Sequence, residues 1–325
     1  MWTEQSGMVP YWLDRLSKQL NSLMVAGGVE FPDLRGFDLV CASDYSGGTK
    51  LRPYFTATFL IVPTNAVREW DEMRIKVRKK WLVDGRTMSF KGLNDQYRRQ
   101  ALSEFLAAAD HMEGVLFTFS IAKGSVEVFC SSEEMARIQA AGAGRVRWKD
   151  ASLRKMMMLS SLHTFLVGGL IGKWRGVFWV TDDDDFTGSH ERMLDLNQWL
   201  KALRARNMPG HRGQAVVQAA SRMANDQLEM CFEDLCAIPD LVAGAWAETI
   251  AEYFPRSLPD PDESIELEIP ELSSKSLKIA KWFAQRHGKL CKAYCLVGSG
   301  GQNGAFTVLA SSSEGFPLND LGDAT

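Results

Sequence analysis

Residues 177–185 read VFWVTDDDD, and this stretch determines how the rest of the chain is interpreted. Its first five residues form an unbroken apolar and β-branched run, which is typical of a strand covered by helices on both faces of a sheet. The run ends abruptly in four aspartates. The stretch therefore predicts an α/β protein in which carboxylates gather at the end of a buried strand.

Further segments rich in β-branched and aromatic residues predict strands around this one. They are residues 37–43 (FDLVCAS), 54–62 (YFTATFLIV), 115–121 (VLFTFSI) and 214–219. The first two are separated by Gly47, Gly48 and Pro53, so they are expected to form a hairpin. A short strand is also predicted over residues 88–91.

Apolar residues at helical spacing predict helices between the strands. The segments are residues 12–23, 95–111, 151–172, 189–206 and 239–254. Ser189 is suited to the start of the fourth helix, and Pro239 is suited to the first turn of the last. Residues 156–172 are too short and too polar for a membrane span of about 20 residues, so they predict a buried core helix.

Changes in composition divide the chain into four parts. They are an N-terminal helix in 1–36, a core in 37–254 with an insertion near 124–150, a linker in 255–272 and an extension in 273–325. The linker is acidic and dotted with proline, which is typical of an exposed segment. The extension combines a helix over 276–287 with strands over 290–297 and 305–310.

The composition is that of a packed globular protein, with 46% hydrophobic residues and ten tryptophans. A formal net charge of −3 provides no field that would gather nucleic acid or an anionic membrane, so contact with a polyanion must come from local basic patches. The first ten residues lack the basic and apolar run of a secretory signal. We therefore expect a cytoplasmic protein without a membrane partner.

The cysteines and one histidine are expected to be structural. Six cysteines lie at positions 41, 130, 231, 236, 291 and 295, without C-x-x-C pairs or histidines at zinc-ligand spacing. Reduced thiols are expected, with Cys291 and Cys295 in the core. His163 lies on the apolar helix over 151–172, where a core histidine with satisfied hydrogen bonds is expected.

Acidic residues stand where predicted elements end or begin: Asp44 after the first strand, Asp182 and Asp183 in the aspartate run, and Asp240 at a helix start. Carboxylates that approach each other repel, and a divalent cation keeps them ionised. Mg²⁺ or Mn²⁺ suits oxygen ligands, and two such ions can activate water and stabilise the leaving oxygen of a phosphodiester. These four residues are the candidate metal ligands and catalytic residues.

Each acid also has a purely structural interpretation. Asp44 could cap the turn after the first strand. The aspartate run could be a solvated approach to the helix at 189, favoured by the helix dipole, and Asp240 could act similarly at its own helix start. A calcium loop is disfavoured, because Leu194 stands where the bidentate glutamate belongs when Asp183 is the first ligand.

Nine basic and two acidic residues lie within residues 73–99, with three aromatic residues among them. This combination suits a phosphate-lined path with stacking platforms. Arg78, Lys79 and Lys80 are its candidate phosphate contacts. The alternative is an ordinary solvated helix face beside core aromatics.

Two short motifs resemble those of a large family of bacterial and phage-associated proteins with a ribonuclease H-like fold. That family is known by an N-terminal Asp-Glu-Ser-Gly motif and a C-terminal Gln-x-x-Asp-Leu-x-Ala-Gly-Ala motif. Here residues 44–47 are DYSG and residues 238–245 are IPDLVAGA. Tyr45 stands in place of the family's glutamate, and Ala237 in place of its glutamine. The resemblance covers roughly residues 37–254.

The resemblance implies a ribonuclease H-like mixed sheet of about five strands flanked by helices. Together with the insertion and the C-terminal helix-hairpin extension that the residue pattern indicates, the predicted fold class is α/β. The resemblance also implies metal-binding acids on the first strand, near the end of a middle strand and on the last helix. Asp44, Asp182 or its neighbour Asp183, and Asp240 fall on those places. Lys91 resembles a basic residue that the family carries before its first main helix, and is expected to contact phosphate.

These observations predict a nuclease or phosphodiesterase that acts on DNA or RNA with Mg²⁺ or Mn²⁺. The alternative is a catalytically degraded nucleic-acid-binding or adaptor protein, in phage defence or a mobile element, which binds through residues 74–99 without turnover. A phosphodiesterase of small molecules is a third hypothesis, because it differs only in substrate. The sequence indicates no particular protein partner.

Overall fold

The structure is a computed structural model. It describes residues 2–6, 12–25, 30–47, 53–123, 148–171, 176–182, 187–207, 215–219, 230–253, 273–285, 288–298 and 306–310, and the single positions 125, 129 and 133. Most of the predicted insertion near 124–150 and the whole of the predicted linker over 255–272 lie outside the described residues.

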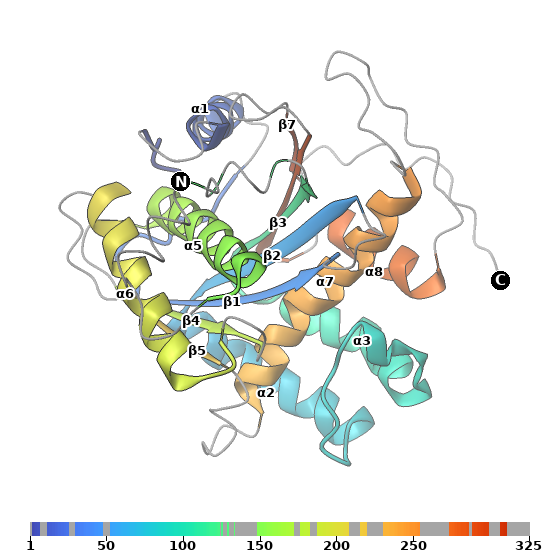
Figure 1. Cartoon of the computed structure of the whole chain (residues 1–325). Coiled ribbons are helices and arrows are strands. Elements are labelled where there is room, and N and C mark those ends of the chain that lie inside the picture. Colours follow the sequence, from blue (N-terminus) through green and yellow to red (C-terminus); the bar gives the residue numbers. More distant parts are fainter. Residues whose placement is uncertain are drawn as a thin grey trace.

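Seven strands form one mixed sheet in the order β5-β4-β1-β2-β3-β6-β7 (Figure 1). The strands are β1 (Leu39–Ser46), β2 (Tyr54–Pro63), β3 (Gly114–Ala122), β4 (Val177–Thr181), β5 (Ala215–Ala219), β6 (Leu290–Val297) and β7 (Phe306–Ala310). β2 runs antiparallel to its neighbours β1 and β3, whereas β4 is parallel to β1 and β5 is parallel to β4. The first five strands form the predicted mixed sheet, and the predicted pairing of the first two strands is confirmed.

The central strands are buried almost throughout, which explains their continuous apolar sequences. Every residue of β2 is buried, and β3 is buried except at its last residue. A strand with one solvated face would alternate between apolar and polar residues. The helices of this protein therefore cover both faces of the sheet.

Two groups of helices form these two layers (Figure 1). α1 (Trp12–Val25), α5 (Asp150–Leu170) and α6 (His190–Asn207) pack on one face, and α2 (Thr64–Trp81), α3 (Gln96–Ala109), α7 (Cys231–Tyr253) and α8 (Ser274–Ala284) pack on the other. Each layer encloses its own hydrophobic cluster against the sheet.

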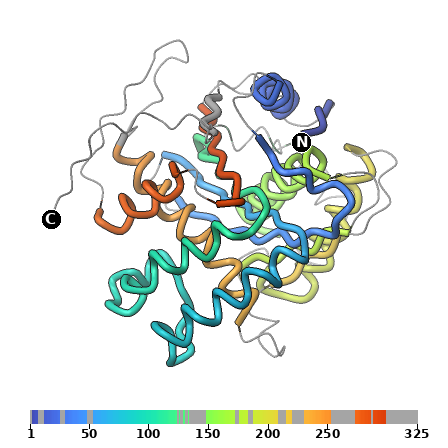
Figure 2. The backbone as a smooth tube through the Cα atoms, turned by 180° about the vertical axis from the view of Figure 1, so that it is seen from behind, coloured from blue at the N-terminus to red at the C-terminus, as the bar shows by residue number. Residues whose placement is uncertain are grey.

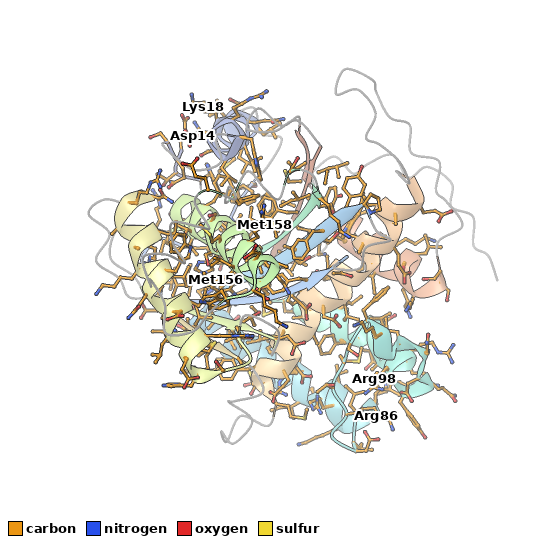
Figure 3. All side chains as sticks on the ribbon, in the orientation of Figure 1. Asp14, Lys18, Arg86, Arg98, Met156 and Met158 are labelled. Atoms are coloured by element: carbon orange, nitrogen blue, oxygen red, sulfur yellow. The ribbon has the colours of Figure 1, made fainter. Side chains whose placement is uncertain are left out.

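The predicted core helix is confirmed as α5, in which every residue from Met156 to Leu170 is buried. Figure 3 shows Met156 and Met158 of this helix in the middle of the molecule. Within the part of the chain that the structure describes, no helix combines the length and the apolarity that a membrane crossing requires.

α2 and α3 run side by side, as Figure 2 shows from behind. A buried ion-pair network ties α2 to the first turn of α7. Asp234 accepts hydrogen bonds from Arg74 at 2.9 Å and from Arg78 at 2.8 Å, and the side chains of Arg74 and Asp234 are fully buried. This network fixes the start of α7 relative to α2.

Two predicted elements differ in the structure. Residues 88–91 form no strand, and Lys91 instead begins a 3₁₀ turn, η1 (Lys91–Asn94), which precedes α3. The helix expected to begin at Pro239 begins at Cys231, so Pro239 lies in its interior. Proline is favoured in a first helical turn, but here it occurs later and removes the N–H that would bond the carbonyl of Leu235.

The C-terminal extension joins the same sheet. β6 pairs in parallel with β3, and β7 pairs antiparallel with β6. Lys292 of β6 is fully buried, and its Nζ lies 2.6 Å from Oδ1 of Asp110 at the end of α3. Trp282 of α8 donates its indole N–H to the same carboxylate at 2.8 Å. The extension is therefore bound to the core through both strand pairing and a buried charge.

Candidate functional site

The site lies where β1 and the neighbouring parallel strand β4 carry their acids. Ser43 pairs in register with Thr181, so Asp44 and Asp182 follow at the same level of the two strands. Val40 and Ala42 of β1, and Val180 of β4, belong to the cluster under α7. Because side chains alternate along a strand, Asp44 and Asp182 lie on that same face.

Asp240 reaches this place from α7, which packs against β1 and β2. The backbone N–H of Phe90 donates to Oδ2 of Asp240 at 2.6 Å. Asp240 therefore stands well inside a helix and not at a helix start, so its interpretation as an electrostatic aid to helix initiation is wrong. Asp44 likewise lies within β1 and not in the turn that follows it.

The charges of the three acids act on one another. Burial raises the pKa of Asp44 well above its usual value, and the nearby charges of Asp240 and Asp182 raise that pKa further. Burial also raises the pKa of Asp240 to about 6; the Phe90 N–H opposes this rise, and the charge of Asp182 adds to it. The charges of Asp182 and Asp240 are therefore near enough to act on Asp44, and that of Asp182 is near enough to act on Asp240.

Three lysines lie around the acids. The charge of Lys155, on α5, lowers the pKa of Asp44, while the charges of Lys91 and Lys275 lower that of Asp240. Lys91 is exposed, and Lys155 and Lys275 are half-buried. Of these, only Lys91 was predicted from the sequence. The other two come from helices whose position beside the acids depends on tertiary packing.

Cys236 is a further residue of the site that the sequence interpretation missed. It precedes Asp240 by one helical turn, so the two side chains share one face of α7. Burial raises the pKa of its thiol well above the usual value, and the charges of Asp44 and Asp182 raise it further. The i, i+4 spacing to Asp240 was the available signal, but it depended on a helix that begins before Pro239.

Gly244 permits the close approach of Phe90 to α7. A Cβ at this position would lie 2.3 Å from Cγ of the Phe90 ring. Gly244 follows Asp240 by one turn of the helix, so the ring packs directly beside the carboxylate that the Phe90 N–H binds. The glycine of the AGA motif therefore positions a hydrogen-bond donor at Asp240.

Tyr45 occupies the opposite face of β1 from Asp44. Its hydroxyl lies 2.6 Å from Oγ of Ser43 and 3.1 Å from Oγ1 of Thr181, and its ring packs against the cluster under α5. Its backbone N–H donates to Oδ1 of Asp44. The phenol of Tyr45 therefore lies on the α5 side of β1, away from the side that carries Asp44 and Asp240.

The donor set suits a hard divalent cation in its chemistry. Asp44 and Asp240 offer carboxylate oxygens, and a cation between them would relieve the repulsion that raises their pKa values. Within the described ranges, no three His, Cys, Asp or Glu side chains are arranged to hold a metal ion. Asp182 is exposed, and Asp183, the fourth predicted ligand, lies outside the described residues.

The predicted phosphate contacts on α2 have different surroundings. Arg78 is buried and bound to Asp234, so its prediction as a phosphate contact is wrong. Lys79 is exposed, and Lys80 is exposed but pairs with Glu104 at 2.7 Å. The three cations are neighbours in one basic segment of the sequence. Arg78 differs from the other two because its partner, Asp234, is buried and lies 156 residues further along the chain.

Other cations of the basic segment also bind inside the protein. Arg86 pairs with Asp95 at 2.7 Å, and Arg98 donates to the backbone carbonyl of Thr87 at 2.7 Å. Figure 3 shows Arg86 and Arg98 together at the periphery, away from Met156 and Met158. Much of the positive charge that suggested a nucleic-acid path therefore stabilises the α2–α3 region instead.

The remaining expectations concern His163 and the thiols. His163 is a core residue stacked on Trp179 at a centroid distance of 4.4 Å, but neither ring nitrogen has a hydrogen-bond partner among the described residues, so it is not satisfied. Burial and the charge of Arg204 lower its pKa to about 3. Among the described residues, neither Cys291 nor Cys295 forms a disulfide; Cys295 is buried and Cys291 is half-buried. Cys130 lies outside the described residues.

No protein-family model matches the sequence, and no curated protein matches it. Among solved structures, the chain is similar to the ribonuclease H2 from Pyrococcus horikoshii OT3, with a TM-score of 0.32 and 9% sequence identity. The alignment covers 76% of this chain and 100% of that one.

Proposed function

We propose that this protein is a divalent-metal-dependent phosphodiester hydrolase that acts on nucleic acid. The observation that supports the proposal is the placement of Asp44 and Asp182 at the same level of β1 and β4, with Asp240 on α7, which packs against β1. The charges of Asp240 and Asp182 add to the rise in the pKa of Asp44. Carboxylates that act on one another in this way are relieved of their repulsion by protonation or by a bound cation. Such an arrangement persists where it has a function.

In this proposal Asp44 and Asp240 are the principal ligands of Mg²⁺ or Mn²⁺, and Asp182 contributes as a third. A bound divalent cation supplies electrostatic stabilisation to a phosphodiester and its attacking water. The chain itself orients the ligands: Phe90 holds Asp240 through its backbone N–H, and Tyr45 holds Asp44 in the same way. Lys91, exposed beside Asp240, contacts a phosphate oxygen.

The test is cleavage of labelled single-stranded and duplex DNA and RNA by the purified protein, with Mg²⁺ or Mn²⁺. Asp44→Asn and Asp240→Asn should each reduce cleavage to background, while the melting temperature shows that the variants remain folded. Asp33→Asn, an exposed aspartate paired locally with Arg35, serves as a control and should cleave normally. Full cleavage by both site variants would refute the proposal.

A second candidate function is nucleic-acid binding without catalysis. The observation that favours it is Tyr45, whose phenol is hydrogen-bonded to Ser43 and Thr181. The family that the sequence resembles has a carboxylate at this position. The two functions differ in their response to metal. Titration of Mg²⁺ or Mn²⁺ should raise the melting temperature of the wild-type protein but not of Asp44→Asn if the site binds metal, whereas an unchanged wild-type melting temperature supports the binding protein.

A further inference from the structure

Two carboxylates of the site share one local arrangement. Asp240 accepts a hydrogen bond from the backbone N–H of Phe90, and Asp44 accepts one from the backbone N–H of Tyr45. The ammonium group of a lysine lies over each of these aromatic rings. Nζ of Lys275 lies 4.1 Å from the centroid of the Phe90 ring, and Nζ of Lys155 lies 5.0 Å from that of Tyr45.

The two lysines approach from different layers of the protein. Lys155 belongs to α5, on the face that Tyr45 occupies, and Lys275 belongs to α8, on the face of Asp240. Lys275 also donates to the backbone carbonyl of Phe90 at 3.4 Å. Both side chains are half-buried, so the rings and the backbone hold their stems while part of each remains accessible to solvent.

We propose that Lys155 and Lys275 are phosphate contacts on the two sides of the acid cluster, and that they hold the backbone of a nucleic-acid strand across it. This inference rests on the proposed function, because it assigns the substrate path of the same site. A lysine at each side of the carboxylates matches a polymer with phosphates on both sides of the bond to be cleaved. The contacts are independent of base sequence, since they involve phosphate alone.

The C-terminal extension thereby becomes part of the site. Lys275 lies in α8, and α8 packs on α7, the helix that carries Asp240. The buried contacts of Lys292 and Trp282 with Asp110 hold the same helix in place. The extension therefore does more than enlarge the sheet, because it brings a cation beside the residue that binds Asp240.

The experiment measures binding and not cleavage. The host is Asp44→Asn/Asp240→Asn, which removes turnover and the repulsion of the substrate. Fluorescence anisotropy follows a fluorescein-labelled single-stranded oligonucleotide over a range of KCl concentrations, without divalent metal. Lys155→Met and Lys275→Met are added singly to the host, with Lys155→Arg and Lys275→Arg as variants that keep the charge. Lys18→Met on α1 and Lys281→Met on α8 are matched controls, because both lysines are exposed.

Each lysine-to-methionine variant should weaken binding about three- to tenfold and reduce the slope of log K against log salt by about 0.7, the value for one lost phosphate contact on a single strand. The arginine variants should keep the slope of the host. A structural role for the lysines would change the melting temperature but not this slope. Lys155→Gln and Lys275→Gln replace any methionine variant that does not fold.

Unchanged slopes in the charge-neutral variants, or no binding of the oligonucleotide by the host, would overturn the inference. Its failure is distinguishable from that of the proposed function. Metal-dependent cleavage by the wild type together with unchanged slopes refutes the lysine contacts alone. Reduced slopes together with a wild-type protein that does not cleave support the contacts and refute the hydrolase.

Discussion

The backbone N–H of Phe90 donates to the carboxylate of Asp240 at 2.6 Å, across 150 residues of sequence. This bond opposes the rise in the pKa of Asp240 that burial causes. It forms because Gly244, one turn further along α7, leaves room for the Phe90 ring. One glycine thus determines the environment of one carboxylate.

Gly244→Ala should therefore destabilise the protein by about 1–3 kcal/mol, the usual cost of overpacking. In a solvent-exposed helix the same change would stabilise by about 1 kcal/mol. Urea unfolding of the metal-free protein measures the effect. A double-mutant cycle with Phe90→Ala provides the control, because the alanine at 244 should cost little once the ring is absent. Strict additivity of the two changes would contradict the packing described for this pair.

Asp44→Asn and Asp240→Asn should each raise the melting temperature of the metal-free protein at pH 8. The folded-state pKa of each carboxyl lies above its unfolded value. The folded protein therefore loses stability as the pH rises through the interval between these two pKa values. For Asp240 the interval runs from the usual 3.8 to about 6. The gain from asparagine should therefore disappear below this interval.

Melting curves of both variants and the wild type between pH 4 and 8 check this expectation. Asp33→Asn is the control, and its melting temperature at pH 8 should not rise, because pairing with Arg35 lowers the pKa of Asp33 to about 2. A melting temperature at pH 8 that falls in both site variants would show that the acids do not repel each other.

His163→Phe should make the protein less sensitive to acid. The folded-state pKa of His163 is about 3, below its usual 6.5, so the folded protein binds fewer protons than the unfolded chain between these values. Its contribution to stability is full above the unfolded pKa and is lost, by up to about 1.4 kcal/mol per pH unit, as the pH falls through that window. Phenylalanine keeps the stacking on Trp179 and removes two unsatisfied nitrogens.

The measurement is the free energy of unfolding from urea titrations at several values between pH 4 and 7. The difference between His163→Phe and the wild type should increase as the pH falls. Parallel pH profiles for His163→Phe and the wild type would show that this imidazole titrates normally.

Asp234→Asn should cost about 3–5 kcal/mol, because it removes the buried anion that both Arg74 and Arg78 bind. Arg74 is fully buried, and Arg78 is nearly so. Asp71→Asn is a matched control, since Asp71 also pairs with Arg74 but is partly exposed, and should cost about 1 kcal/mol or less. Urea unfolding measures both, and equal losses would show that the buried network has no special weight.

The strands and their acids could be predicted because strand residues carry a local signal. The apolar runs of β1, β2, β3 and β4 are long and continuous, and the aspartates follow two of them directly. The start of α7 could not be predicted, because proline is favoured in a first helical turn, whereas Pro239 occupies the interior of this helix. The strand predicted over residues 88–91 similarly does not form, and Phe90 contacts α7 instead.

The roles of residues that depend on distant partners could not be predicted from the sequence. Arg78 looks like its neighbours Lys79 and Lys80, and only the position of Asp234 shows that it is buried. Lys155 and Lys275 stand beside the acids because α5 and α8 cover opposite faces of the sheet. Local patterns contain no such information.

The pairing of β6 with β3 has a consequence for shortened forms of the chain. A protein that ended before α8 would leave β3, buried over nearly its whole length, as the outermost strand. Its unpaired N–H and C=O groups and its apolar side chains would form a template for strand addition by other molecules. Such a truncation would be expected to self-associate, so residues after the linker protect the sheet against aggregation.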